Sequence, residues 1–241
     1  SPEAPVPIVK VEKEVFELGG AANVAKNIVS LGGKVLLFGY IGDDRVGERL
    51  LKELDKRKIS FHLPRLLKQT IQKTRIIGNN NQIARIDKEN YINVQENFED
   101  DLCQKILKEN PEIIIVSDYG KGTITNTLIS RLKNKGIKII VDPKPKNKID
   151  YSNVYLITPN LKEAIEITEL NDVSEAGKSL QKSYLSNILI TRGRDGMTLF
   201  EGGEEINFPT QAREVYDVSG AGDSVVAALG LCIASEMNLK D

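Results

Sequence analysis

The sequence predicts an α/β fold: a doubly wound, mostly parallel sheet with helices on both faces and a small antiparallel β lid. Three observations lead to this prediction. Short apolar segments alternate with amphipathic segments of helical spacing through most of the chain. Two other segments break that alternation and resemble paired, half-exposed strands. The length of 241 residues suits one large domain with a small appendage.

Five apolar segments are expected to form the parallel strands. They are rich in β-branched residues and lack strict alternation, as in strands that helices cover on both faces. These segments are residues 34–42, 112–118, 137–142, 154–158 and 187–191.

Several segments are expected to form helices. Residues 43–58 begin with an aspartate cap and continue with apolar residues at helical spacing. Residues 126–136 end in a glycine, which is typical of a helix C-terminus, and residues 173–185 are amphipathic. Residues 224–236 are nearly all apolar, which predicts a buried helix.

The lid is predicted from two segments that do not fit the parallel sheet. Residues 6–18 alternate like a half-exposed strand, and residues 70–87 look like two strands joined at a GNNN turn. We expect lid strands near 6–18 and 61–87, which cover a site, form a dimer surface, or do both. No repeat or linker divides the chain, so residues 1–241 are expected to form a single domain.

Composition limits the chemistry that the chain can perform. A net charge of −1 gives no general attraction to nucleic acid or to an anionic membrane. Cys103 and Cys232 are isolated, and the sequence contains no membrane-spanning apolar run or signal-peptide pattern, which predicts a cytoplasmic protein. His62 is the only histidine, which excludes the usual Ser-His-Asp and Cys-His nucleophile systems. Catalysis must therefore use carboxylates, lysines, backbone amides or a metal ion.

The most informative motif is VYDVSGAGDS, residues 215–224. Its glycines open the apolar helix, and uncovered N–H groups at a helix start form an anion site. Asp223 lies inside that site, where a carboxylate repels a bound phosphate. This placement suits a base that takes a proton from a hydroxyl while the amides hold the transferred phosphoryl group. The structural alternative is a glycine-rich turn that caps a core helix.

Two other motifs follow predicted strands and suit a nucleotide. TPNLKEA, residues 158–164, opens a helix, and its Asn160 and Glu163 either form a capping box or face a phosphate with its magnesium. TRGRDG, residues 191–196, has glycines that allow close approach of a nucleotide, or it is a simple turn.

Three more motifs suit the acceptor substrate. LGGAANVAKN, residues 18–27, places small residues at a helix start, either against a substrate or for close helix packing. SDYGKG, residues 117–122, and VDPKPK, residues 141–146, each place an acid and a lysine after a predicted strand. Ligands of open α/β sheets bind outside the carboxyl ends of the strands, so these motifs are expected to converge there.

Two apparent motifs are rejected. GKS at 177–179 lacks the glycine that a phosphate-binding loop needs five residues earlier, since that residue is Asp172, and it falls in a helical segment. GAGDSV fails the dinucleotide fingerprint because Val225 replaces its last glycine, which disfavours an oxidoreductase.

Three motifs are similar to those of a known family: GGAANVA, the N-x-x-E of Asn160 to Glu163, and DVSGAGDS. Through them the chain resembles the ribokinase-like carbohydrate kinases, also called the phosphofructokinase-B family. The resemblance covers essentially all 241 residues. It implies a ribokinase-like fold, an ATP-dependent phosphotransferase that uses Mg²⁺, and a β lid that often forms a homodimer contact. It gives Asp223 the role of catalytic base.

The predicted site residues fall into four groups. The anion hole is Gly220, Ala221 and Gly222. The nucleotide-binding residues are Asn160, Leu161, Lys162, Glu163, Thr191, Arg192, Gly193 and Gly196, with Glu163 also at the metal, through water. The substrate-binding residues are Gly19, Gly20, Asn23, Arg85, Asp118, Lys121, Asp142 and Lys144. Lys121, Lys144 and Arg85 are the candidates for a sugar phosphate.

Within the family, the motifs look most like the branch that phosphorylates D-glycero-D-manno-heptose 7-phosphate on the path to ADP-heptose and lipopolysaccharide cores. Alternatives are a kinase for another sugar or a nucleoside, and a non-catalytic binding module of the same fold. By resemblance, the chain lacks the family's first strand and its last adenine-lining elements. Residues 1–241 alone are therefore expected not to be a competent kinase.

Overall fold

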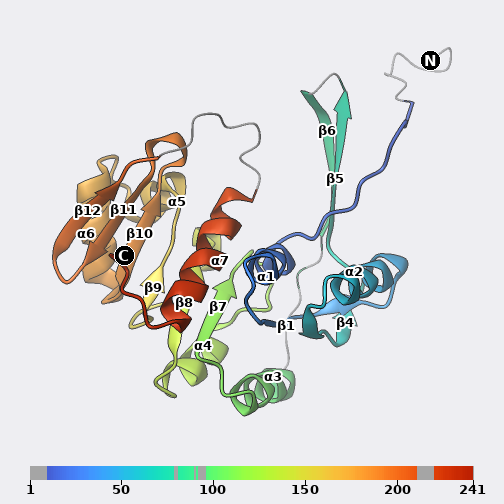
Figure 1. The fold of residues 1–241 in the computed structure, drawn as a ribbon, viewed down its shortest axis with the longest axis horizontal. Helices are drawn as coiled ribbons and strands as arrows, with labels where there is room; N and C mark the ends of the chain where they lie inside the picture. The colour runs from blue at the N-terminus through green and yellow to red at the C-terminus, as the bar shows by residue number, and fades with distance from the viewer. Residues whose placement is uncertain (1–9, 79–80, 90, 92–95, 211–219, 241) are drawn as a thin grey trace.

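A six-stranded sheet forms the centre of the protein (Figure 1). The structure, a computed structural model, describes residues 10–78, 81–89, 91, 96–210 and 220–240. The strand order is β12-β11-β10-β9-β8-β7, and the members are β7 (Ile113–Ser117), β8 (Lys138–Asp142), β9 (Leu156–Ile157), β10 (Asn187–Thr191), β11 (Met197–Glu201) and β12 (Glu204–Phe208). Strands β7 to β10 run parallel to one another, whereas β11 runs antiparallel to both of its neighbours, β10 and β12.

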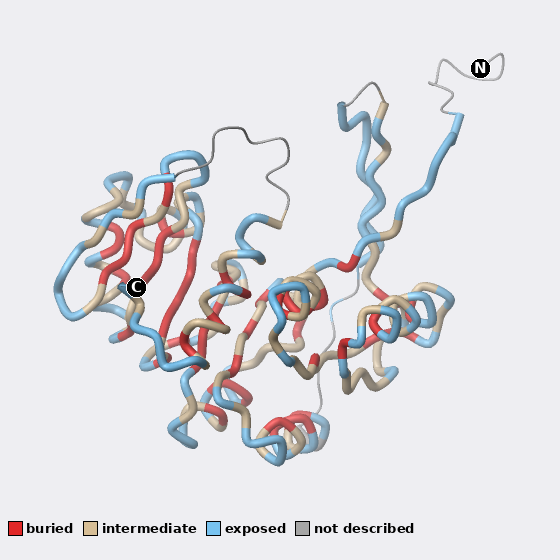
Figure 2. The backbone as a smooth tube through the Cα atoms, in the orientation of Figure 1, coloured by how far each residue is buried: buried red, intermediate tan, exposed pale blue. Residues whose placement is uncertain are grey.

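Helices cover both faces of this sheet, because successive strand residues point to opposite faces. Ile139 and Val141 of β8 face a core that also contains side chains from α3 (Glu96–Lys108), α4 (Asn126–Lys133), α5 (Leu161–Thr168) and α6 (Val173–Tyr184). Ile140, between them, faces a second core with α1 (Ala21–Ser30) and α7 (Ala221–Ala234). Figure 2 shows the buried strands between exposed helix surfaces. This arrangement confirms the doubly wound α/β prediction.

Local sequence signals set where several helices begin. The side chains of Asp44, Thr125, Asn160 and Asp172 each accept a backbone N–H in the first turn of α2 (Arg45–Lys56), α4, α5 and α6. Gly177 of the rejected GKS triplet lies within α6, where an added Cβ would be 2.1 Å from the Phe200 ring. That glycine therefore allows close packing of α6 on β11.

The remaining strands form three small sheets. β1 (Leu36–Phe38) pairs with β3 (Ser60–His62), and β2 (Ile41–Gly42) pairs with β4 (Arg65–Leu67), both in parallel. β5 (Gln72–Gly78) and β6 (Asn81–Lys88) form an antiparallel hairpin that extends away from the body (Figure 1). The predicted hairpin over 70–87 is thus confirmed, although part of the predicted 61–87 lid pairs elsewhere.

The structure differs from the sequence prediction near the N-terminus. Residues 6–9 lie outside the described residues, and residues 10–18 contain no strand. Val11 and Val15 are exposed, so the apolar alternation there does not correspond to a buried face. Three elements were not predicted: α3, and the β11–β12 hairpin that extends the parallel sheet at one edge.

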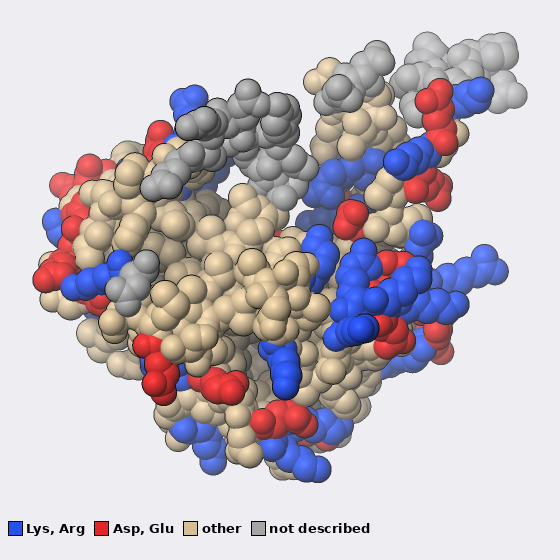
Figure 3. Space-filling model, viewed as in Figure 1, with Lys and Arg blue, Asp and Glu red and all other residues tan. Residues whose placement is uncertain are grey.

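The surface of the described part carries both acidic and basic side chains (Figure 3), as expected from the net charge of −1. In Figure 3, acidic and basic side chains are interspersed around the edges of the visible face, and uncharged side chains cover its centre over α7. Among the described residues, no helix combines the length and apolarity needed to cross a membrane.

Candidate functional site

The start of α7 lies at the centre of the candidate site. Gly220 is the N-cap with φ of 80°, a left-handed conformation that favours glycine. Ala221 and Gly222 are exposed, so the first turn of the helix is open to solvent. First-turn N–H groups have no intrahelical acceptor and lie at the positive end of the helix dipole. Gly220, Ala221 and Gly222 are thus located where an anion can bind.

Asp223 lies in this first turn and accepts two hydrogen bonds. Asn23 Nδ2 of α1 donates to Asp223 Oδ2 over 2.6 Å, and the Tyr119 hydroxyl donates to Oδ1 over 3.2 Å. A second link joins the same helices, since Asn27 Nδ2 donates to Ser224 Oγ over 3.1 Å. Three sequence motifs, 18–27, 117–122 and 215–224, therefore meet at one carboxylate.

Tyr119, which the sequence prediction did not single out, also lies in the candidate site. Its ring lies against Gly20, where an added Cβ would be 3.3 Å from Tyr119 Cε2. Burial raises the pKa of the Tyr119 hydroxyl, and the carboxylates of Asp223 and Asp142 raise it further. Tyr119 therefore stays protonated and acts as a donor to Asp223. The SDYGKG motif contains this residue, but nothing local indicates where its side chain points.

Asp118, predicted to contact substrate, is engaged within the protein. Its side chain is buried and accepts from the Gly120 N–H at 2.7 Å, Asn147 Nδ2 at 2.7 Å and the Tyr151 hydroxyl at 2.6 Å. Both oxygens thus have donors, and the carboxylate anchors the 117–122 loop to the body. The loop position of Tyr119 follows directly from this anchor.

The candidates for a sugar phosphate at the lid are paired with carboxylates. Glu89, just after β6, contacts Lys121 Nζ and also Lys73 Nζ of β5, the latter at 3.2 Å. Arg85 Nε lies 3.0 Å from Asp87 Oδ1 on the same strand. Glu89 therefore joins the base of the lid to the loop that contains Tyr119.

Asp142 ends β8, Lys144 lies two residues further on, and both face the same region. Burial raises the pKa of Asp142 to about 7, helped by the negative charges of Glu163 and Asp223 and opposed by Lys144. Lys144 Nζ lies 3.5 Å from Glu163 Oε1. The structure thus brings Asp142, Lys144, Glu163 and Asp223 to the carboxyl ends of neighbouring strands, as the sequence predicted.

The predicted nucleotide loops lie side by side. The Thr191 N–H donates to the Pro159 carbonyl over 3.0 Å, which joins the end of β10 to the residue before Asn160. Leu161 packs against the core and Lys162 is exposed. Arg192 precedes a short 3₁₀ turn, Gly193–Asp195.

Glycines in the 191–196 loop meet strict backbone requirements. Gly193 and Gly196 have φ of 59° and 86°. A Cβ at Gly196 would be 2.0 Å from the Phe208 carbonyl oxygen, so no other residue fits there without a shift. The turn alternative for this loop is thus present, and close approach of a nucleotide remains a prediction.

Asn160 and Glu163 form the capping box that the sequence allowed. Asn160 Oδ1 accepts the Glu163 N–H at 3.0 Å, and Glu163 Oε2 accepts the Asn160 N–H at 3.1 Å. Glu163 Oε1 faces Lys144. One carboxylate oxygen is thus used by the helix, and the other points toward the region of Asp142.

Glu163 is the candidate residue for contact with a magnesium ion. In the described part of the chain, no cluster of three or more His, Cys, Asp or Glu side chains could hold a metal ion. Mg²⁺ keeps several waters and is often held by one or two carboxylates together with substrate phosphates. Glu163 fits such a role, since Oε1 has no partner closer than the 3.5 Å contact with Lys144. A binding mode through water to a nucleotide-bound ion is thus compatible with these residues.

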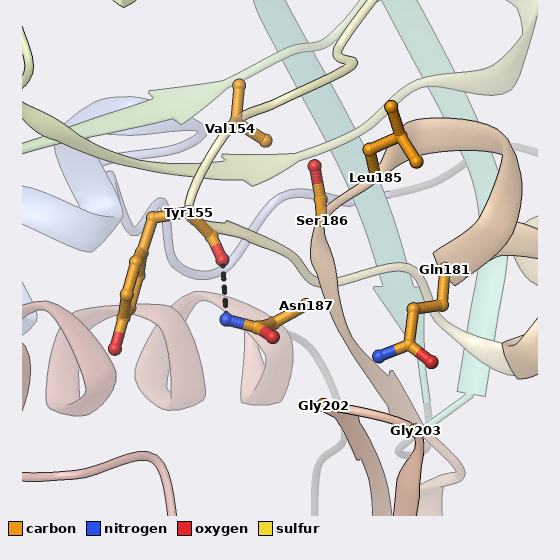
Figure 4. Close-up of a pocket in the computed structure, with 8 residues that line it drawn as sticks. All are labelled: Val154, Tyr155, Gln181, Leu185, Ser186, Asn187, Gly202 and Gly203. Carbon is orange, nitrogen blue, oxygen red and sulfur yellow. Dashed lines mark hydrogen bonds between the residues drawn. The ribbon is translucent and has the colours of Figure 1, made fainter.

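A separate pocket of about 460 Å³ lies at the other end of the sheet. Tyr155 and Asn187 line it. Tyr155 precedes β9 and Asn187 begins β10, and the opposite, carboxyl ends of these two strands border the candidate site. Asn187 Nδ2 donates to the Tyr155 carbonyl over 3.1 Å (Figure 4). Because it lies at the amino ends of β9 and β10, this pocket is not part of the site around Asp223.

An α/β fold with an anion-binding helix start and an adjacent carboxylate is typical of phosphotransferases. The model for the pfkB family carbohydrate kinases matches residues 2–241, so the chain belongs to the pfkB family of carbohydrate kinases. It is thus a sugar kinase by family.

Curated relatives agree with this assignment. The chain is 43% identical over 256 residues to the "Bifunctional protein HldE" of Helicobacter pylori strain G27, with 100% of this chain and 55% of the relative covered. It is 37% identical over 259 residues to the HldE of Magnetococcus marinus, with 100% of this chain and 53% of the relative covered. The chain therefore spans about half the length of the curated relatives it matches.

Solved structures support the fold. Phosphofructokinase-2 from Escherichia coli, in its tetrameric inhibited form, has a TM-score of 0.83 at 22% identity over 98% of this chain and 83% of its own. Ribokinase from Thermotoga maritima has a TM-score of 0.78 at 20% identity over 99% of this chain and 80% of its own. The ribokinase-like prediction is thus confirmed.

Proposed function

We propose that the protein transfers the γ-phosphoryl group of ATP to D-glycero-D-manno-heptose 7-phosphate and forms heptose 1,7-bisphosphate. The observation that carries this proposal is the position of Asp223, whose carboxylate lies in the open first turn of α7. The similarity to HldE, a bifunctional heptose kinase and adenylyltransferase, supports the choice of sugar. The product would enter the path to ADP-heptose and lipopolysaccharide cores.

The chemistry assigned to this site is an in-line displacement. Asp223 removes the proton from the anomeric hydroxyl as the sugar oxygen forms its bond to the γ-phosphorus. The bond from that phosphorus to the bridging oxygen breaks, and ADP leaves. The backbone N–H groups of Gly220, Ala221 and Gly222 stabilise the charge on the transferred group.

The nucleotide is assigned to the adjoining strand ends. Asn160 to Glu163 and Thr191 to Gly196 lie next to one another at β9 and β10, on the same edge as Asp223. Magnesium, when bound, neutralises phosphate charge during transfer. Glu163 would contact it through water, and Lys144, beside Glu163, would face the phosphates.

The acceptor sugar is assigned to the lid side of the site. Gly20 and Asn23 border Asp223. Lys121 offers positive charge at the lid base, and Arg85 does so on the lid strand β6. Their carboxylate partners, Glu89 and Asp87, would have to yield these cations to the 7-phosphate. A phosphate at the same cations would gain charge-assisted hydrogen bonds from them.

A homodimer through the lid is part of the proposal. The side chains of Ile77, Ile83 and Ile86 on β5 and β6 are 64%, 56% and 51% exposed. Burying these apolar side chains against a second copy would stabilise the dimer by about 25 cal/mol per Å² of apolar surface removed from water. The hairpin extends from the body, where a second copy can reach it (Figure 1).

The test uses the full-length protein, ATP and Mg²⁺ with a panel of acceptors: D-glycero-D-manno-heptose 7-phosphate, fructose 6-phosphate, ribose and adenosine. We expect the heptose phosphate to give the highest kcat/KM and a product whose second phosphorus is on C1 by ³¹P NMR. A higher kcat/KM for ribose or adenosine would assign the protein to another branch of the family. ATP binding without ADP formation from any acceptor would favour the non-catalytic module.

A further inference from the structure

Each carboxylate oxygen of Asp223 has its own donor. Oδ2 accepts the Asn23 amide at 2.6 Å, and Oδ1 accepts the Tyr119 hydroxyl at 3.2 Å. The two donors come from different elements, α1 and the loop after β7. A single donor leaves a carboxylate free to turn about its Cβ–Cγ bond, whereas donors on both oxygens fix its plane.

Tyr119 is itself held on two sides. The preceding residue, Asp118, is buried and bound to Gly120, Asn147 and Tyr151. The Tyr119 ring lies against Gly20, whose φ of 56° and lack of a Cβ leave room for the ring. The hydroxyl is therefore placed by a loop that Asp118 anchors and by a small-residue helix start.

We infer that Tyr119 is a positioning residue for the catalytic base, whose hydroxyl, together with the Asn23 amide, orients the Asp223 carboxylate toward the acceptor hydroxyl. This inference rests on the proposed function, in which Asp223 takes the proton. A carboxylate oxygen accepts two hydrogen bonds, so Oδ1 can hold the Tyr119 hydroxyl and the substrate hydroxyl together. The raised pKa of Tyr119 keeps it a donor throughout the working pH range.

The test is Tyr119→Phe in the full-length protein with ATP, Mg²⁺ and heptose 7-phosphate. Phenylalanine keeps the ring contact with Gly20 and removes only a partly exposed hydroxyl, so the fold is expected to survive. We expect kcat to fall about tenfold, the loss of one hydrogen bond to a charged group. Each KM should change less than about twofold, because the lost interaction acts on the base rather than on ground-state binding.

Tyr155→Phe is the matched control. Its hydroxyl lies at the amino end of β9 and, in Figure 4, points away from the other labelled residues. Loss of this hydroxyl should leave kcat and both KM values unchanged. The same change at Tyr119, introduced into an Asp223→Asn background, should cause no further loss.

Separate outcomes contradict the inference and the proposed function. A parental kcat in Tyr119→Phe, with Asp223→Asn inactive, would overturn the positioning role and leave the function intact. An increase in the KM of the sugar alone would also overturn it, because it would make Tyr119 a substrate contact. Retained activity in Asp223→Asn would instead contradict the assignment of the base.

Discussion

Asn23 on α1 donates a hydrogen bond of 2.6 Å to Asp223 on α7, although 200 residues separate them in the chain. The contact joins the small-residue motif near the N-terminus to the glycine-rich motif near the C-terminus. An added Cβ at Gly220 would be 2.8 Å from Asn23 Nδ2, so the glycine at the helix start is also needed for this contact. The orientation of the candidate base thus depends on the packing of α1 against α7.

Asp223→Asn is expected to abolish phosphoryl transfer and leave ATP binding largely intact. The change is nearly isosteric and removes the proton acceptor. Turnover should fall by at least about 100-fold, the usual contribution of a general base. Steady-state kinetics and calorimetric titration with ATP would measure both effects. Turnover within about tenfold of the parent would mean that another group acts as the base.

Glu163→Gln is expected to raise the Mg²⁺ concentration needed for half-maximal activity. The substitution removes the charge of Glu163 beside Lys144 while a side-chain oxygen remains for the cap. Thr125→Ala removes a comparable cap, on α4, and is the control. It should cost about 1 kcal/mol of stability without affecting the magnesium titration. If Glu163→Gln behaves in the same way, Glu163 only stabilises the start of α5.

Ile86→Lys is expected to convert a dimer to a monomer. Ile86 lies on β6, whose residues are all exposed in the single chain, so a lysine there is tolerated by the fold but not at an apolar interface. Sedimentation velocity across a concentration series would report the change. Leu185→Lys is the control, since Leu185 is 69% exposed at the distant pocket. A parent that is monomeric at every concentration would contradict the lid dimer.

Asp142→Asn is expected to stabilise the protein at pH 8 and to have little effect near pH 4. Burial raises the pKa of Asp142 from 3.8 to about 7. Between these values the folded state holds a proton that the unfolded state has lost, so stability falls as pH rises. Asparagine removes this penalty. Thermal melting of both proteins from pH 4 to pH 8 would measure it.

Asp150→Asn provides the opposite case as a control. Hydrogen bonds from Ser152 lower the pKa of Asp150, so its stabilising contribution is present at neutral pH and is lost in acid. Its replacement should therefore lower the melting temperature at pH 8. Parallel melting curves for the Asp142 variant and the parent would mean that Asp142 is not buried in its neutral form.

Local signals in the sequence were enough to predict much of the fold. The apolar segments at 112–118, 137–142 and 187–191 are strands β7, β8 and β10, because a strand covered on both faces must be apolar throughout. Caps and a glycine likewise placed the starts of α2, α5 and α7, since these signals act within one helical turn. The Asp223 motif was readable for the same reason: its helix start and its carboxylate are adjacent in sequence.

Only the tertiary structure decided which side chains meet. Tyr119 and Asn23 converge on Asp223 because α1, the loop after β7 and α7 pack together, and no local pattern encodes that packing. The carboxylate of Asp118 serves as a loop anchor because Tyr151 and Asn147 reach it from beyond β8. The alternating segment at 10–18 forms no strand for a related reason. A strand exists only when it pairs with a neighbour, and in the described residues the β5–β6 hairpin has no third strand, so residues 10–18 do not pair with its open edges.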